Sequence, residues 1–242
     1  PLRERQCVSF RSMFKPSTVC EIEQFVDHSH FSSILRSMNE KLDTREQILQ
    51  AAMERIMHYG YGKTTMAEIA RDCGMSAGNI YRFFASKIDI AEAMARKLNM
   101  EINAQNAALV RGKGSATEKM RLFHRTALIK TFEKLDNNVK VLEVAEVLSH
   151  ERPNFANEEL AQERIYLVQL LEQGIAEGAF APMDNPNFIA EMMQSATMKF
   201  RYPQLWSRLT LPKLERELSG VMDIILAGLS VPIKTRELLS AE

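Results

Sequence analysis

The stretch TTMAEIARDCGMSAGNIYRFFASK, residues 64–87, decides how this chain folds. Its first half repeats apolar residues at the spacing of one helix face: Met66, Ile69, Ala70 and Cys73. Thr64 and Thr65 precede this repeat and are good candidates to cap the helix. Gly74 follows it and is predicted to end the helix. The first half of the stretch therefore predicts one short helix.

The second half predicts another short helix, which Ser76 can cap. Its large apolar residues are expected to point into the core: Ile80, Phe83 and Phe84. Two short helices joined by a glycine-containing turn of about four residues form a helix-turn-helix, in which the second helix enters the major groove of DNA. The spacing of the stretch therefore predicts this motif.

The outward face of the second helix is rich in small and hydrogen-bonding residues: Ala77, Gly78, Asn79, Tyr81 and Arg82. Small residues let a helix approach the base edges closely. Asparagine can pair with adenine and arginine with guanine, whereas hydroxyl groups commonly meet phosphates. The composition of this face favours DNA recognition.

Helical patterns flank the motif on both sides. Before it, one helix face carries Ile48, Leu49, Ala52, Ile56 and Tyr59, and Gly60 and Gly62 are predicted to end that helix. After it, Ser86 can cap a longer helix whose apolar residues are Ala91, Met94, Leu98 and Ile102. Three short helices are therefore expected to lead into a long one.

Residues 44–100 resemble the DNA-binding region of the tetracycline-repressor (TetR/AcrR) family of bacterial transcription regulators, with the segment 64–87 carrying most of the likeness. The resemblance implies phosphate contacts from Thr65, Ser76, Tyr81 and Lys87. It also implies base-edge or groove contacts from Ala77, Gly78, Asn79 and Arg82. Many members have lysine or arginine at the position of Ala77, which implies that some of the base readout here shifts onto Asn79 and Arg82.

The charge of the chain limits how it can bind DNA. The 31 lysines and arginines equal the 31 aspartates and glutamates, which excludes a uniformly basic protein that coats nucleic acid. Within 62–88, however, four basic residues outnumber two acidic ones: Lys63, Arg71, Arg82 and Lys87 against Glu68 and Asp72. We therefore expect few phosphate contacts and an affinity that depends on two correctly spaced helices.

Other classes of protein find little support in the sequence. Cys7, Cys20 and Cys73 are odd in number and widely spaced, which argues against a disulfide framework or a thiolate zinc site and favours a reducing cytoplasm. The apolar stretch 221–233 is too short to span a membrane and contains Asp223. We expect a soluble cytoplasmic protein without metal, cofactor, membrane contact or catalytic cluster, and not an enzyme.

The C-terminal half predicts an all-α bundle, with helical patterns over 116–135, 138–150, 157–178, 185–201 and 212–229. Apolar faces of the last two patterns are predicted to form a two-fold dimer interface: Phe188, Met192, Leu214, Leu218, Val221, Met222, Ile225 and Leu229. The alternative is that these faces belong only to the core of one chain.

A mixture of flexible apolar, aromatic and single polar residues in the bundle is suited to a small-molecule pocket: Met120, Phe123, His124, Phe132, Tyr166, Leu170 and Met198. Residues at such spacing are also typical of a plain helical core, so both interpretations stay open. A pocket of this composition predicts an apolar or amphipathic effector.

Three segments follow from these patterns. Residues 1–40 are expected to be an extension that is poorly ordered or outside the conserved fold, the alternative being a short helix around 21–36 that packs on the domain. Residues 41–86 form the helix-turn-helix DNA-binding domain, and 87–242 form the helical domain for effector binding and dimerisation.

We expect a homodimeric repressor that binds a palindromic operator and is released by a small-molecule inducer. The alternatives are an activator or a partner-binding module on the same fold, with a helical enzyme a distant third.

Overall fold

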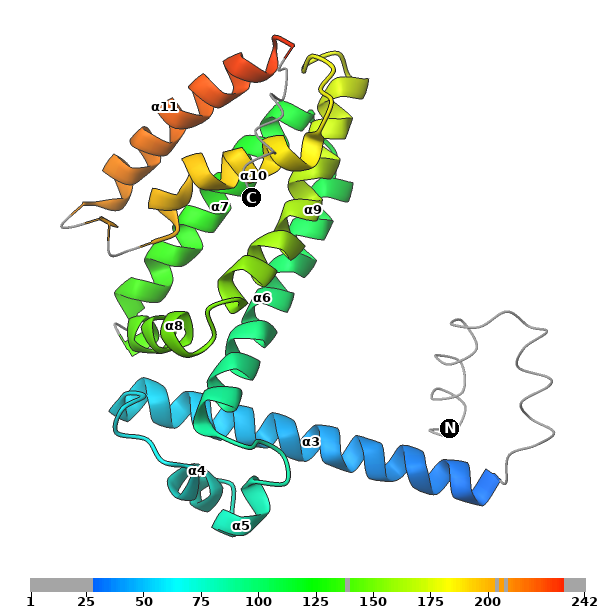
Figure 1. Cartoon of the computed structure of the whole chain (residues 1–242), viewed down its shortest axis with the longest axis vertical. Coiled ribbons are helices and arrows are strands. Elements are labelled where there is room, and N and C mark those ends of the chain that lie inside the picture. The colour runs from blue at the N-terminus through cyan, green and yellow to red at the C-terminus, as the bar shows by residue number, and fades with distance from the viewer. Residues whose placement is uncertain (1–27, 138–139, 203–204, 207–208, 233–242) are drawn as a thin grey trace, which may run out of the picture. The chain divides into compact units, whose positions relative to one another are not determined.

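The computed structural model describes residues 28–137, 140–202, 205–206 and 209–232, and every regular element in these ranges is a helix (Figure 1). The elements are α3 (His28–Tyr59), α4 (Met66–Asp72), α5 (Ala77–Ile80), α6 (Lys87–Arg111), α7 (Ala116–Asn137), α8 (Lys140–Glu151), α9 (Phe155–Ala176), α10 (Pro186–Ala196), the 3-10 helix η1 (Met198–Phe200) and α11 (Leu211–Leu229). The expected all-α fold, a helix-turn-helix followed by a helical bundle, is confirmed.

The first helix within the described residues, α3, begins at His28, well before Thr44, where the apolar repeat becomes clear. Internal contacts divide the chain into two units, Pro1–Gln50 and Ala51–Glu242, and the boundary lies inside α3. Residues 1–27 lie outside the described residues, so the interpretation of 1–40 as an extension beyond the conserved fold stays a prediction.

Local capping signals set the helix-turn-helix. Thr65 and Glu68 form a capping box at the start of α4, because the Thr65 hydroxyl accepts from the Glu68 backbone nitrogen at 3.3 Å while the Glu68 carboxylate accepts from the Thr65 nitrogen at 2.9 Å. Gly74 ends α4 with φ of 67°, a left-handed conformation that favours glycine. The Ser76 hydroxyl accepts from the Asn79 nitrogen at the start of α5. The predicted cap positions Thr65 and Ser76 are therefore confirmed.

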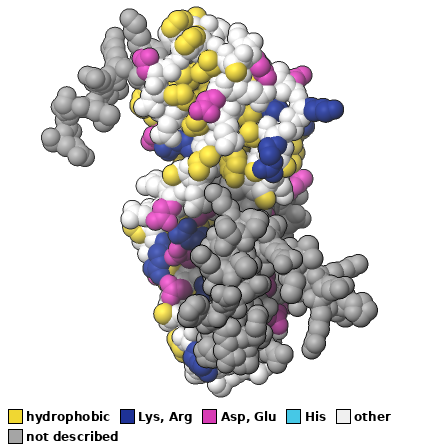
Figure 2. All heavy atoms as spheres, turned by 90° about the vertical axis from the view of Figure 1, so that its right-hand side faces the viewer, with side chains coloured by type: hydrophobic (Ala, Val, Ile, Leu, Met, Phe, Trp, Pro, Cys, Tyr) yellow, Lys and Arg dark blue, Asp and Glu magenta, His cyan; other side chains and the backbone are white. Residues whose placement is uncertain are grey.

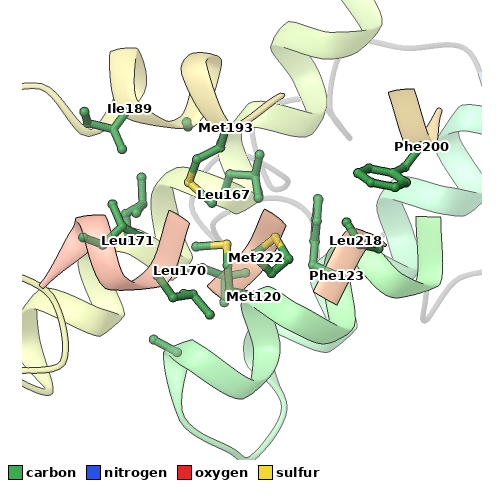
Figure 3. Packing of buried hydrophobic residues seen from close by; sticks show 14 of the residues in the cluster. Met120, Phe123, Leu167, Leu170, Leu171, Ile189, Met193, Phe200, Leu218 and Met222 are labelled. Atoms are coloured by element: carbon green, nitrogen blue, oxygen red, sulfur yellow. The ribbon is translucent and has the colours of Figure 1, made fainter. Parts of the chain in front are cut away.

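Helix α6 runs from the helix-turn-helix into the bundle, where it packs against α7, α8 and α9 (Figure 1). The bundle core is a single cluster contributed mainly by α7, α9, α10 and α11, in which Met120, Leu167, Leu170, Leu171 and Leu214 are fully buried (Figure 3). Such a core, held by contacts between distant parts of the chain, stabilises the bundle through the burial of apolar surface.

The bundle surface mixes apolar and charged side chains. Figure 2 shows apolar side chains reaching the surface on the upper part of one face, with acidic and basic groups scattered among them. Several large apolar side chains are exposed on bundle helices: Leu122, Ile165, Met192 and Ile224. None of the helices described here carries an apolar stretch long enough to reach across a lipid bilayer.

Candidate DNA-binding site

The residues that the sequence assigns to DNA recognition lie on α5 and in the turn that follows it, because α5 ends at Ile80 and is shorter than expected. Ala77, Gly78 and Arg82 are exposed, Tyr81 is 55% exposed, and Asn79 is half-buried. Ile80 and Phe84 are buried beneath this face, whereas Phe83, which was also expected to point inward, is only half-buried. Asn79 on α5 and Arg82 in the turn after it, the side chains that could read base edges, thus lie above a buried layer of apolar residues.

Gly78 occupies an exposed position that nothing within the chain reserves for glycine. A Cβ atom at Gly78 would meet no other atom within 4 Å, and its φ is not in the left-handed region. Glycine in a helix is less favourable than alanine by up to about 1 kcal/mol. The folded protein therefore has room for a side chain at position 78, although glycine provides none.

Thr65 and Ser76, both exposed, already use their hydroxyl groups for capping, since each accepts a backbone N–H three residues ahead. The Thr65 hydroxyl also donates to the Glu68 carboxylate at 2.8 Å. A hydroxyl oxygen has two lone pairs and one hydrogen, so the Ser76 hydroxyl can still donate to a phosphate while it caps α5.

Lys87, a predicted phosphate contact, is held within the protein. Its Nζ donates to the backbone oxygens of Tyr61 and Thr64, each at 2.8 Å, and lies 4.1 Å from the centre of the Tyr61 ring. Burial lowers the pKa of this ammonium group. Lys87 thus ties the start of α6 to the loop before α4, and one of its three N–H groups is left for a partner outside the chain.

Arg55, which the sequence analysis did not single out, changes the local charge balance. Its Nε donates to Asp72 at 2.5 Å, and its Nη1 lies 3.3 Å from the Glu68 carboxylate. The hydrogen bond from Arg55 lowers the pKa of the Asp72 carboxyl group. The two acidic residues of 62–88 are therefore paired with α3, while Arg82, in the turn after α5, makes no ion pair within the described part of the chain.

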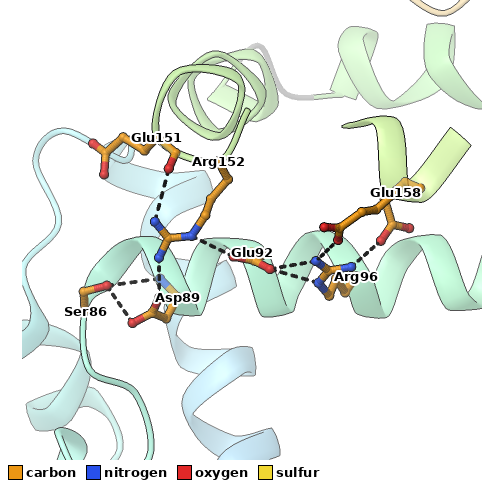
Figure 4. Close-up of polar contacts among 8 residues, drawn as sticks. Ser86, Asp89, Glu92, Arg96, Glu151, Arg152 and Glu158 are labelled. Carbon is orange, nitrogen blue, oxygen red and sulfur yellow. Dashed lines mark hydrogen bonds and ion pairs between the residues drawn. The ribbon is translucent and has the colours of Figure 1, made fainter. Parts of the chain in front are cut away.

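Long-range polar contacts tie the helix-turn-helix and the start of α6 to the bundle. The Tyr61 nitrogen donates to the Glu143 carboxylate of α8 at 3.0 Å, and the Lys140 ammonium of α8 donates to the His58 oxygen. Arg152 donates to Asp89 at 2.5 Å and to Glu92 at 2.9 Å (Figure 4). These partners are 60 or more residues apart, so no local sequence pattern could have shown them.

A cleft of about 470 Å³ opens beside these contacts, away from the predicted effector residues. It is lined by His58, Tyr59, Gly62, Lys63, Lys140 and Glu143. The predicted effector residues lie in the bundle instead: Met120, Phe123, His124 and Leu170 are buried, and Phe132, Tyr166 and Met198 are half-buried. Five of these residues belong to the core cluster or pack against it: Met120, Phe123, Phe132, Tyr166 and Leu170.

The structure separates the predicted dimer residues into two groups. Leu214, Leu218, Met222 and Leu229 of α11 are buried within one chain and are not available to a second. Phe188, Val221 and Ile225 are half-buried, and Met192 is 42% exposed. The open face of α11 is instead marked by Ile224, which is 76% exposed and was not among the predicted residues.

Comparison with known proteins places these features in one family. Residues 48–94 match the model of bacterial regulatory proteins of the tetR family, and residues 116–222 match that of the tetracyclin repressor-like C-terminal domain. The transcriptional regulator TtgR of Pseudomonas putida is 29% identical over 118 residues, which are 48% of this chain and 54% of TtgR. The match therefore spans about half the length of that relative.

Two solved structures show the same fold. A TetR/AcrR-family regulator of Thermobifida fusca is 23% identical, with a TM-score of 0.58 over 77% of this chain and 98% of its own. FadR of Thermus thermophilus, a repressor solved in complex with lauroyl-CoA, is 19% identical, with a TM-score of 0.59 over 82% and 99%. The names of these relatives are those of transcriptional regulators and not of enzymes. With its helix-turn-helix and its C-terminal bundle both matched, this chain belongs to the tetR family of bacterial regulatory proteins.

Proposed function

We propose that this chain is a repressor that binds a palindromic DNA operator as a homodimer and is released by a small-molecule inducer. The observation that carries the DNA-binding part is the exposed surface of α5 and the turn after it, where Ala77 and Gly78 leave room beside Asn79, Tyr81 and Arg82. Asn79 and Arg82 would read base edges, while Ser76, Tyr81 and the remaining N–H of Lys87 would contact phosphates. Thr65 would contact a phosphate by exchanging its hydroxyl hydrogen bond to Glu68 for one to the phosphate. Such binding would take place in the cytoplasm, where bacterial DNA lies.

The proposed dimer interface is the open face of α11, together with α10. Gly220, Ile224 and Gly228 recur every four residues on this face, and a Cβ at either glycine would meet nothing within 4 Å. Two glycines inside a helix destabilise it, and close packing of a neighbouring helix against them can offset this loss. A second copy would place Ile224 against these gaps, with Met192 of α10 beside it, across a two-fold axis.

The inducer would bind in the α7–α11 bundle and act through α6 and α8. Only a ligand that binds one arrangement of the two recognition helices better than another can change operator affinity. The contacts of Arg152 with Asp89 and Glu92, and of Glu143 with Tyr61, connect bundle helices to the DNA-binding part. The lauroyl-CoA complex of Thermus thermophilus FadR supports an effector with a large apolar part.

Selection from random DNA tests the proposal without knowledge of the operator. We expect the protein to enrich a palindrome whose half-sites lie about one helical turn, ~34–36 Å, apart or a multiple of it. The variant Arg82→Ala should bind the selected site roughly 5- to 150-fold more weakly and tolerate more base changes. Arg111→Ala, which removes an exposed arginine at the far end of α6, is the matched control and should bind normally. Enrichment of no palindrome would refute the proposal.

A further inference from the structure

The imidazole of His124 carries an unexplained polar atom in the bundle core. His124 lies on α7 and is 3% exposed, and its Nε2 has no hydrogen-bond partner. Among the described residues it is the one buried side-chain nitrogen or oxygen in this condition. Leaving such an atom unpaired destabilises a fold, and native proteins rarely keep one without a reason such as a bound water or a ligand.

The chemistry of His124 limits what could pair with it. Burial and the nearby positive charge of Arg201 lower the pKa of the imidazole to about 3, so the ring is neutral at physiological pH. Arg201 is itself held by two hydrogen bonds to the Glu163 carboxylate. A neutral imidazole presents Nε2 as a donor or an acceptor according to its tautomer. A hydroxyl group, which can both donate and accept, satisfies either tautomer.

The surroundings of His124 are apolar and adaptable. Met120 and Leu128 lie one turn before and after it on α7, and the Phe123 ring meets the imidazole edge-on with centres 5.4 Å apart. Met120, Met193 and Met222 belong to the same core cluster (Figure 3). Methionine side chains are unbranched and repack readily, so a core rich in them can adjust to admit a small apolar molecule.

We propose that Nε2 of His124 is the hydrogen-bonding anchor of the effector site, and that the effector is an uncharged, mainly apolar molecule that carries a hydroxyl group. This inference rests on the proposed function, in which the bundle binds the effector. A pure hydrocarbon would leave Nε2 unpaired. A carboxylate would meet a neutral ring and an arginine already engaged by Glu163, and burying a charge without a partner is far more unfavourable than burying a hydroxyl.

Three probes with the same eight-carbon chain test this inference: 1-octanol, n-octane and sodium octanoate. Trp206, the single tryptophan, is buried in the core cluster against the Phe132 ring, so its fluorescence can report binding in the full-length protein. Titrations compare the wild type with His124→Phe, which keeps an aromatic ring and removes Nε2. His150→Phe, a change of the same kind at an exposed position on α8, is the control.

We expect the wild type and His150→Phe to bind octanol most tightly. In His124→Phe the preference for octanol over octane should fall roughly tenfold, the size of one lost hydrogen bond. In wild-type protein, octanol but not octane should also shift the ¹⁵N resonance of His124 Nε2, a readout that does not depend on the variant folding.

An unchanged preference in His124→Phe, tightest binding of octanoate, or no binding of any probe to the wild type would each overturn the inference. Binding of the selected palindrome is measured on the same samples. If that binding persists while the probe results fail, the inference about His124 is wrong and the DNA-binding function stands.

Discussion

Glu143 on α8 accepts a hydrogen bond at 3.0 Å from the backbone nitrogen of Tyr61, in the loop that follows α3. The same carboxylate oxygen lies 2.8 Å from the position that a Cβ atom on Gly60 would occupy. Lys140, one turn earlier on α8, donates to the His58 oxygen at the end of α3. The bundle is therefore joined to the end of α3 by hydrogen bonds between side chains of α8 and backbone atoms, which makes this junction sensitive to the residue at position 60.

Gly60→Ala is expected to destabilise the protein. Gly60 has φ of 94°, which disfavours any side chain, and its Cβ would press on Glu143. We expect the free energy of unfolding to fall by roughly 1–3 kcal/mol in urea titrations. Gly62→Ala, where a Cβ meets nothing within 4 Å, is the control and should change it by less than about 0.5 kcal/mol. Equal effects at both positions would contradict this account of the junction.

Lys87→Met should weaken both the fold and DNA binding. The variant keeps the aliphatic stem but leaves the Tyr61 and Thr64 oxygens without their donor, so the free energy of unfolding should fall by roughly 1–3 kcal/mol. Operator and random DNA should lose affinity alike, because a phosphate contact carries no sequence information. Lys113→Met, at an exposed position after α6, is the control for loss of charge. Unchanged stability in urea would show that the two hydrogen bonds contribute nothing.

The sequence predicted the helix-turn-helix well because its signals are local. The Thr65 cap, the left-handed Gly74 and the Ser76 cap each act within a few residues, and they place the starts of α4 and α5 where the pattern indicated. α5 ends at Ile80, however, and does not continue to Phe83 and Phe84 as expected. The role of Lys87 inside the protein was missed, since its partners lie 23 and 26 residues away along the chain.

The faces of α11 show a second limit of sequence reasoning. Helical spacing predicts that Leu214, Leu218 and Val221 lie on an apolar face of the helix, but it does not say which part of that face meets the chain's own core. That depends on how α7 packs against α11, a contact between segments about 100 residues apart. The structure buries Leu214 and Leu218 and leaves Ile224 open.

Gly78→Ala should separate stability from DNA binding. Because a Cβ at this position meets no atom of the protein, alanine should raise the free energy of unfolding by a few tenths to about 1 kcal/mol. If Gly78 is glycine because DNA approaches it closely, the same variant should bind the selected palindrome more weakly in fluorescence anisotropy. A variant that is more stable and binds the operator as tightly as the wild type would show that the DNA groove does not need the space left by Gly78.

Asp89 should make the α6–α8 junction sensitive to acid. Hydrogen bonds from the Ser86 hydroxyl and from Arg152 hold the pKa of the Asp89 carboxyl below its ordinary value of 3.8. Because this pKa is lower in the folded than in the unfolded protein, the ionised Asp89 carboxylate stabilises the fold at pH values above its ordinary pKa. This stabilisation is lost as the pH falls through the pKa of the folded state. Unfolding measured between pH 6 and about pH 3 should therefore show a smaller loss of stability in Asp89→Asn than in the wild type. Identical pH profiles would argue against a contribution from this carboxylate.

Ile224→Glu should convert the proposed dimer into monomers. Ile224 lies on the open face of α11 between Gly220 and Gly228, so a carboxylate there leaves the protomer core intact but would bury two like charges across a two-fold axis. Light scattering should then give the mass of one chain, and affinity for the full palindrome should fall while weak binding to a half-site remains. Ile165→Glu, at a similarly exposed isoleucine on α9, is the control and should leave the dimer unchanged. A dimer that survives Ile224→Glu would move the interface to another face of the bundle, because two buried glutamates at the centre of a close helix contact could not be accommodated.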